Sequence, residues 1–281
     1  MLLEDLNLES LLASGLLARV EHHPRLTSTN DHARLAATEA GELPLLVIAD
    51  EQTAGRGRGA NRWWTGRGSL ACSLLFEPAA SGIERRYFSM ISLAAAVAIV
   101  ETAAPLVAQR PIGVHWPNDV FVSDRKLAGI LVEALPDGKH IVGIGCNVNN
   151  SLAEAPAELQ KIVTSLADLT GRSQHRAAFL LELLERLQAN LGTLAAAPES
   201  LGERANELCL QRGRRLTLQT GQCAGRGRPA LHRNAPGEGA RPSMRILASG
   251  VCAGIAPDGA LLLETPTGLQ THYSGVLVHD A

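Results

Sequence analysis

The stretch that decides the fold runs Gln52-Thr-Ala-Gly-Arg-Gly-Arg-Gly-Ala-Asn-Arg-Trp-Trp-Thr-Gly-Arg-Gly68, and no carboxylate lies between Glu51 and Glu77. Its glycines allow positive φ and expose backbone N–H groups, while its arginines present planar forks that match carboxylates and phosphates. Strand-like apolar runs flank it on both sides, Pro44 to Ala49 and Leu70 to Phe76. We therefore expect a loop that is anchored by two strands and binds an anion.

The alternative for the same loop is a solvated Arg-Gly segment that contacts RNA without specificity. The flanking strands and the Trp63-Trp64 pair favour an ordered loop instead. A formal net charge of −2, with only three Trp, two Tyr and four Phe, also argues against general nucleic-acid binding. Neither a P-loop nor a Rossmann-type glycine turn is present, so the loop requires another kind of anion chemistry.

The composition indicates a cytoplasmic chain without a membrane partner. Its 281 residues, 46% of them hydrophobic, suffice for one large domain and a small one. The five cysteines are scattered, with no CxxC and no histidine cluster at zinc spacing, which predicts a reducing compartment and no structural metal. The leucine-rich N-terminus begins with the acidic Glu4 and Asp5, the wrong sign for a secretory signal. The apolar run Met90 to Val100 is too short to span a bilayer and predicts a buried helix.

Lysine is rare in this chain and therefore informative. Only Lys126, Lys139 and Lys161 occur, among 26 lysines and arginines. A lysine that persists in so arginine-rich a chain is a candidate for a role that needs a compact ammonium group. Lys126 is the one that we single out.

The expected secondary structure alternates between helices and antiparallel strands. Leu2 to Val20 reads as an amphipathic helix, and a second helix begins near Ser28, with Asp31 spaced as in a capping box and Gly41 as its end. For Ser28 alone, a simple cap is the first interpretation, although the adjacent hydroxyl and amide can also bind a small polar ring. The next expected elements are a helix over 84–109, hairpins turning at 123–125 and 136–138, and helices over 174–197 and 198–210.

The tail predicts a small β-barrel of SH3 type. Short strands are expected over 215–220, 246–255, 260–264 and 270–273, with a turn at Pro257-Asp258-Gly259. Residues 223–244 are rich in Gly, Arg and Pro and repeat AGRGR, and a flexible hairpin insert is favoured over a second anion site. The expected fold is thus α+β: a mixed sheet with packing helices over 1–210, then an SH3-like domain over 211–281.

Three stretches now coincide in chain order: Ser28-Thr29-Asn30, then QTAGRGRGANRWW from Gln52, then WPNDVFVSDRKLAGILVE from Trp116 followed by GIGCNVNN from Gly143. Together they closely resemble the biotin protein ligases, also called biotin–[carboxylase] ligases or holocarboxylase synthetases. The resemblance is strong from Thr27 to Asn150 and weak in the tail, through GIAPDGALLLE. It implies a class II synthetase-like catalytic domain followed by an SH3-like domain.

The family's activity implies a two-step ligase reaction. Biotin and ATP give biotinyl-5′-AMP and pyrophosphate, with Mg²⁺ accompanying the ATP. The biotinyl group then passes to one lysine of a biotin carboxyl carrier protein, of acetyl-CoA carboxylase or a related carboxylase. A homodimer is compatible with the resemblance. Some members carry an N-terminal winged helix and repress transcription; only 27 residues precede Ser28, fewer than the roughly 40 at which small domains fold unaided, so no DNA-binding role is expected.

The resemblance also implies residue roles. Ser28, Thr29, Asn30 and Gln52 would hold the ureido ring, which Gly145 would let approach the backbone. Asn118 and Asn147 would face the adenylate. The expected catalytic residues are Lys126 and Arg58, which offset the charge of carboxylate and α-phosphate, and Asp119, which orients or deprotonates the acceptor lysine. The expected ligand-binding set is Ser28, Thr29, Asn30, Gln52, Gly55, Arg56, Gly57, Arg58, Trp63, Asn118, Lys126, Gly129, Gly145 and Asn147, with no metal ligand among them.

Two points stay open at this stage. The nearest rival is a lipoate or octanoate ligase of the same fold, although the polar trio Ser28, Thr29 and Gln52 favours a ureido ring over a thiolane or an alkyl tail. The end of the tail, Tyr-Ser-Gly-Val-Leu-Val from Tyr273, matches the family poorly. Whether the C-terminal domain contacts ATP is therefore undecided by the sequence.

Overall fold

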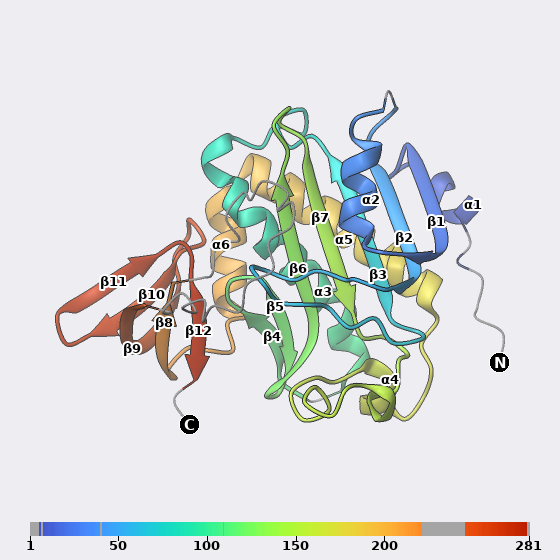
Figure 1. Cartoon of the computed structure of the whole chain (residues 1–281). Helices are drawn as coiled ribbons and strands as arrows, with labels where there is room; N and C mark the ends of the chain where they lie inside the picture. The colour runs from blue at the N-terminus through green and yellow to red at the C-terminus, as the bar shows by residue number, and fades with distance from the viewer. Residues whose placement is uncertain (1–5, 7, 40, 109, 221–244, 280–281) are drawn as a thin grey trace, which may run out of the picture.

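The computed structural model describes residues 6, 8–39, 41–108, 110–220 and 245–279 (Figure 1). A seven-stranded mixed sheet forms the larger part, in the order β1-β2-β3-β7-β6-β5-β4. Strands β1 (Arg19–Leu26) and β2 (Leu45–Gln52) pair in parallel, and all other neighbours are antiparallel. The remaining strands are β3 (Leu70–Phe76), β4 (Ile112–His115), β5 (Asp119–Val122), β6 (Arg125–Ala134) and β7 (His140–Cys146).

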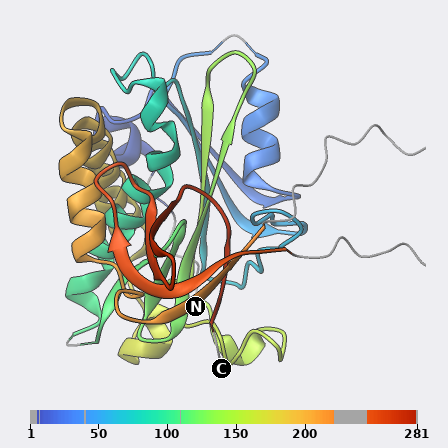
Figure 2. The ribbon, with the colours of Figure 1, turned by 90° about the vertical axis from the view of Figure 1, so that its left-hand side faces the viewer.

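Helices cover both faces of this sheet, as the turned view in Figure 2 shows. Leu46 and Ile48 of β2 belong to the main core on one face, whereas Leu45 and Val47 pack with α2 on the other. A strand buried on both faces reads as a continuous apolar run, which is why β2 and β3 were visible in the sequence. The helices are α1 (Leu8–Ala13), α2 (Thr29–Ala36), α3 (Ile91–Ala103), α4 (Leu166–Thr170), α5 (Arg176–Ala196) and α6 (Pro198–Glu207), with short 3-10 helices η1 (Arg85–Met90), η2 (Ala104–Leu106) and η3 (Leu152–Glu154).

Helix α3 is the central helix of the main core. With η1 and η2 it forms a helical run of 22 residues from Arg85 to Leu106, and the most apolar window of 18 residues in this run is long and apolar enough to cross a membrane. However, 67% of that window is buried inside the protein, where Ala94 to Ile99 are fully covered. The prediction of a buried helix here is confirmed, whereas the expectation that the run is too short to span a bilayer was wrong, because the helical residues extend beyond Met90 to Val100 on both sides.

The C-terminal part forms a second, antiparallel five-stranded sheet beside α6 (Figure 1), in the order β11-β10-β9-β8-β12. Its junction with the larger part is hydrogen-bonded: Trp116 Nε1 donates to Gly259 O (3.0 Å), and Ile255 N donates to Asn206 Oδ1 (2.9 Å). The α+β class, with a small second sheet, is confirmed. Its strands are β8 (Arg215–Gln219), β9 (Ile246–Ile255), β10 (Leu261–Thr265), β11 (Gly268–His272) and β12 (Val276–His279).

Three sequence-based expectations differ from the structure. The expected helix over 2–20 is wrong beyond Ala13, because Arg19 begins strand β1. The second helix ends at Ala36, well before Gly41, and Ser28 occupies its N-cap position without a side-chain capping bond. Strand β12 was not expected. The predicted hairpin insert at 223–244 lies outside the described residues.

Candidate active site

One pocket on the sheet gathers side chains from segments far apart in the chain. It lies over β6 and β7, between the start of α2, the loop joining β2 to β3, the turn from β4 to β5, and the start of β12. Figure 1 shows that loop crossing the face of the sheet in front of β6 and β7. The predicted residues lining the pocket are Ser28, Thr29, Asn30, Gln52, Arg56, Gly57, Arg58, Trp63, Asn118, Asp119, Lys126, Gly129 and Gly145.

The arginine–glycine loop is folded as a small hairpin. Gly57 N donates to Asn61 O (2.8 Å), Trp63 N donates to Gly55 O (3.0 Å), and Gly59 turns the chain with a φ of +64°. A Cβ at Gly55 would lie 2.5 Å from the carbonyl oxygen of Trp63. Gly55 is therefore needed for the hairpin itself. Gly55 was expected from the sequence to bind the ligand, but the residue does not line the pocket.

Arg56 is not the free cation that the sequence predicted. Its guanidinium binds both oxygens of Glu133, at 3.0 and 2.6 Å, and also lies 2.8 Å from Asp31 Oδ1. Burial lowers the pKa of Arg56, but the hydrogen bonds and charges of these carboxylates outweigh burial and raise it. The loop itself contains no acidic residue, so the sequence did not reveal these partners, which come from α2 and β6. In this arrangement Arg56 fastens the hairpin to the sheet.

Arg58 is one of the three loop arginines that line the pocket. Its Nη1 donates to Asn118 Oδ1 (3.1 Å) and to Gly275 O (3.3 Å), both neutral acceptors. Burial lowers the pKa of Arg58, and the charge of Asp119 offsets this only in part. Among the residues that the structure describes, Arg58 has no ion pair, so its charge is available to an incoming anion.

Lys126 and Asp119 form an ion pair in the same pocket, with 2.7 Å between Nζ and Oδ2. Strands β5 and β6 place them there from opposite sides of one hairpin. The Lys126 ammonium also lies 5.7 Å from the centre of the Trp63 ring. The other carboxylate oxygen, Asp119 Oδ1, is buried and has no hydrogen-bond partner within the described part of the chain. A buried acceptor without a partner is costly, so this oxygen is ready for a ligand donor.

The start of α2 supplies a buried polar cluster at the other end of the pocket. Ser28, Thr29 and Asn30 are each under 5% exposed. Thr29 N donates to Gln52 Oε1 (2.8 Å), while Asn30 Nδ2 donates to Glu133 Oε2 (2.8 Å). The hydroxyl of Ser73, on β3, lies 2.7 Å from Asn30 Oδ1 and 2.8 Å from Thr29 Oγ1. The side chains of Thr29 and Asn30 are thus held in fixed orientations, which suits recognition of a small polar group.

Glycines on β7 let side chains pack directly on its backbone. A Cβ at Gly143 would lie 2.0 Å from Asn30 Oδ1, and one at Gly145 would lie 2.3 Å from the ring of Trp63. The space over Gly145, expected for a ligand ring, is therefore taken by the indole. The indole Nε1 is buried and, as far as the structure describes the chain, lacks an acceptor.

Comparison with known proteins identifies the family. The model of the Biotin/lipoate A/B protein ligase family matches residues 23–149. A Biotin–[acetyl-CoA-carboxylase] ligase of Mycobacterium tuberculosis is 34% identical over 201 residues, which cover 69% of this chain and 73% of the relative. The chain belongs to the biotin protein ligase family. The sequence-based expectation of a biotin protein ligase is thereby confirmed.

Two further members of the biotin protein ligase family match almost the whole chain. The Bifunctional ligase/repressor BirA of Bacillus subtilis is 30% identical over 264 residues, covering 90% of this chain and 71% of the relative. The biotin protein ligase from Aquifex aeolicus, solved in complex with biotin and ATP, superposes with a TM-score of 0.74 at 25% identity, covering 93% of this chain and 99% of that one.

The structure also places residues that the sequence did not single out, or placed differently. Asn147 is buried and does not line the pocket: its backbone N–H donates to Leu127 O, and its Oδ1 accepts from Asn150 Nδ2. Glu133 binds both the loop and α2, and the only signal for it was a lone acid ending an apolar strand. Further unexpected contributors include Asp31, Ser73, Gly143, Arg62 and the tail segment 275–277.

Proposed function

We propose that this biotin protein ligase joins biotin to ATP as biotinyl-5′-AMP, releasing pyrophosphate, and then transfers the biotinyl group to a lysine of a carboxylase's biotin carboxyl carrier protein, in the cytoplasm. The observation that carries the proposal is the meeting of two cations, Arg58 and Lys126, with the fixed polar cluster of α2 in one pocket. The pocket thus combines fixed polar groups with cations that have charge available for an anion. Biotin has the matching pattern of a ureido ring and a carboxylate.

In the first step the carboxylate of biotin attacks an α-phosphorus that is surrounded by negative oxygens. Positive charge already in place around both groups lowers that barrier, because it costs no reorganisation during the reaction. Lys126 lies close to Asp119 and can shift between this carboxylate and the reacting oxygens as a compact charge. Arg58, which lacks a carboxylate partner in the described residues, provides the second charge.

The ureido ring needs both donors and acceptors at the polar end. Thr29 and Ser28 offer hydroxyl groups, and Asn30 and Gln52 offer amides whose orientations are fixed by Glu133 and by the backbone of Thr29. A site built to satisfy such a ring rejects an alkyl or thiolane ligand, because its own buried polar groups would be left without partners. This supports biotin over lipoate as the substrate.

Mg²⁺ fits the ATP end of the pocket through a single carboxylate. This ion usually binds one or two carboxylates together with substrate phosphates, and keeps several waters. Asp119 Oδ1, buried and without a partner in the described residues, is the oxygen that would hold it. The ion would offset phosphate charge.

In the second step the acceptor lysine must be neutral, whereas a free lysine has a pKa of about 10.4. Asp119 lies beside Lys126 at the reacting end, where its carboxylate can orient the amine and take its proton. The amine nitrogen then attacks the acyl carbon of the mixed anhydride, the amide bond forms, and AMP leaves. The C-terminal domain helps to enclose this end. Gly275 O accepts from Arg58, and Val276 and Leu277 line the pocket.

The test is biotin-dependent release of pyrophosphate from ATP, run in parallel with lipoate. We expect release with biotin and none above background with lipoate, followed by labelling of a carrier domain by the biotin-loaded enzyme. Release with lipoate alone would assign the rival ligase activity. Steeply salt-dependent RNA binding without any ATP consumption would instead favour the Arg-Gly loop as an RNA contact.

A further inference from the structure

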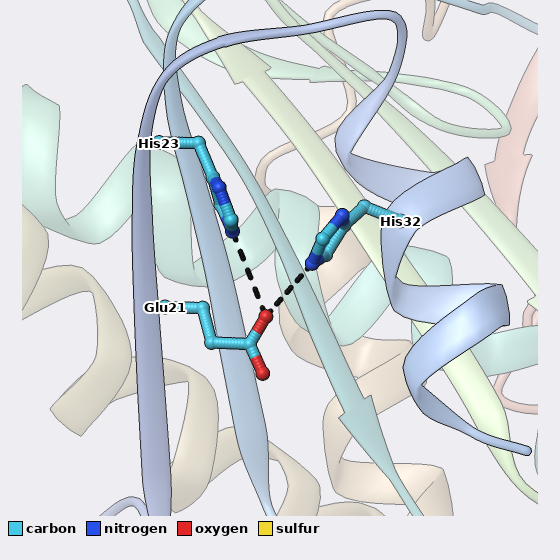
Figure 3. Close-up of side chains that lie close together, drawn as sticks. All are labelled: Glu21, His23 and His32. Carbon is cyan, nitrogen blue, oxygen red and sulfur yellow. Dashed lines mark hydrogen bonds and ion pairs between the residues drawn. The ribbon is translucent and has the colours of Figure 1, made fainter. Parts of the chain in front are cut away.

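Three potential metal ligands meet on the side of α2 that faces strand β1, outside the pocket. Glu21 and His23 are two residues apart on β1, so their side chains point to the same face of the sheet. Helix α2 packs on that face and presents His32. Figure 3 shows all three side chains directed toward one another, two from the strand and one from the helix.

The ligand atoms are close enough for one ion. Glu21 Oε2 lies 2.8 Å from His32 Nε2 and 3.6 Å from His23 Nε2, and the three ligand atoms all lie within 4.8 Å of one another. Zinc binds nitrogen and oxygen at about 2.0–2.2 Å, which sets ligand atoms of a tetrahedral site about 3.3 Å apart. Side-chain shifts of about 1 Å therefore convert this cluster into three corners of a tetrahedron.

Two features distinguish the cluster from an ordinary surface ion pair. His23 Nε2 is buried and forms no hydrogen bond with any residue that the structure describes, so the cluster leaves one ring nitrogen unsatisfied. Glu21 Oε1 accepts from Arg19 Nη2 at 2.6 Å, which fixes the carboxylate and leaves Oε2 for the two histidines. Such an outer partner is the usual way in which a metal-binding carboxylate is oriented.

We propose that Glu21, His23 and His32 form a binding site for Zn²⁺, with water completing the coordination. Two imidazoles and one carboxylate suit zinc rather than Mg²⁺ or Ca²⁺, which prefer oxygen ligands. The side chains are 25–31% exposed, so an ion can enter and retain a water molecule. Sequence spacing did not reveal the site, because the third ligand comes from another element.

The site joins the edge of the sheet to the helix that opens the biotin pocket. Strand β1 pairs only with β2 within the described sheet. One turn before His32, the same helix begins with the buried Thr29 and Asn30 that line the pocket. A bound ion would therefore hold the first turns of α2 against β1. This role is separate from ligation and does not depend on the proposed reaction.

The experiment is calorimetric titration of tag-free, chelator-treated full-length protein with ZnCl2, without ATP or biotin. We expect one zinc ion to bind per chain and millimolar Mg²⁺ not to displace it. His32→Ala and His23→Ala should each weaken the zinc affinity more than about 100-fold, because losing even an outer partner of a metal ligand weakens metal affinity about 10–100-fold. At a hundredfold excess of zinc over its Kd, the Tm should rise by about 5 °C in the wild type and not in His32→Ala. The matched control is His22→Ala, whose ring pairs with Asp50 and should keep wild-type affinity.

Each outcome of this titration decides the matter. Glu21→Gln keeps the size of the side chain and serves as a second loss-of-site variant if an alanine variant unfolds, with folding checked by circular dichroism. Equal zinc binding by the wild type, His32→Ala and Glu21→Gln would overturn the proposal, as would the absence of binding to the wild type. Because biotin-dependent pyrophosphate release is measured separately, failure of the zinc site leaves the ligase assignment untouched.

Discussion

Glu133→Gln is the most informative substitution, because Glu133 joins the loop, the helix and the sheet. Its carboxylate, 18% exposed, accepts two hydrogen bonds from Arg56, one from Asn30 and one from Arg34, at 2.6 to 3.0 Å. Glutamine removes the charge and turns an NH2 group toward donors, which breaks at least one or two of these bonds. A hydrogen bond to a charged group contributes about 1.5–3 kcal/mol.

The expected loss of unfolding free energy is about 2 kcal/mol rather than the full sum, since Arg56 is 35% exposed and keeps Asp31 as a partner. For a chain of this size that corresponds to a fall in Tm of about 5 °C. Asn30 loses its fixed orientation, so the KM for biotin should rise about tenfold. The matched control is Glu182→Gln, which breaks an exposed helix pair with Arg186 and should cost under about 0.5 kcal/mol.

The pH dependence gives an independent check. Burial raises the pKa of Glu133, but the hydrogen bonds of Arg56 and Asn30 and the charges of Arg56 and Arg34 outweigh it, so the pKa is lowered. A lowered pKa means that the carboxylate stabilises the fold above its ordinary value of about 4.3, and that this stability is lost as pH falls through the lowered value. In urea unfolding, the difference between wild type and variant should be constant from pH 8 to 6 and shrink below pH 4. A difference of less than about 0.5 kcal/mol in unfolding free energy between the wild type and Glu133→Gln at pH 7 would refute this reasoning. A difference between the two that stayed undiminished at low pH would also refute it.

Three more predictions concern the reacting end. Lys126→Arg should slow biotin-dependent ATP–pyrophosphate exchange at least about 100-fold, because a forked cation cannot replace the compact ammonium; wild-type exchange would contradict its role. Arg58→Ala should release biotinyl-AMP at least tenfold faster in gel-filtration retention assays, and unchanged retention would count against its contact with the adenylate. Gly145→Ala should cost about 1–3 kcal/mol in thermal unfolding by forcing Trp63 off the strand, whereas Gly192→Ala, an open position in α5, should stabilise slightly. Equal effects of the two glycine substitutions would argue against that close approach.

The parts of the fold that were predictable from sequence are those buried on both faces. The strand from Leu70 to Phe76 was predicted over its full span. All seven of its residues are buried, so it shows in the sequence as one nearly continuous apolar run with clear ends. Strand β1 was missed, since RVEHHPRL has polar residues on both faces and a proline, as an edge strand tolerates. Its parallel partner lies 26 residues further along, as the pairing of Arg19 with Leu45 shows, and no local pattern reveals such a pairing.

The candidate site was predictable where one motif carried its own residues, and not where partners came from elsewhere. The resemblance to the biotin protein ligases implied site roles for Arg58, Asn118 and Lys126, and the three residues share the pocket. Arg56 pairs with Glu133, 77 positions away, and a local charge count could not reveal that partner. The tail segment at Gly275 reaches the pocket because β12 pairs with β8. A strand of only four residues is too short for its sequence pattern to predict that pairing.

The most direct test of the account is a crystal structure of the protein with a non-hydrolysable biotinyl-AMP analogue. We predict that the ring of biotin contacts Thr29 and Asn30, and that the bridge between the acyl and phosphoryl groups lies within about 3 Å of Arg58 and Lys126. An analogue bound with that bridge far from both cations would contradict the proposed chemistry.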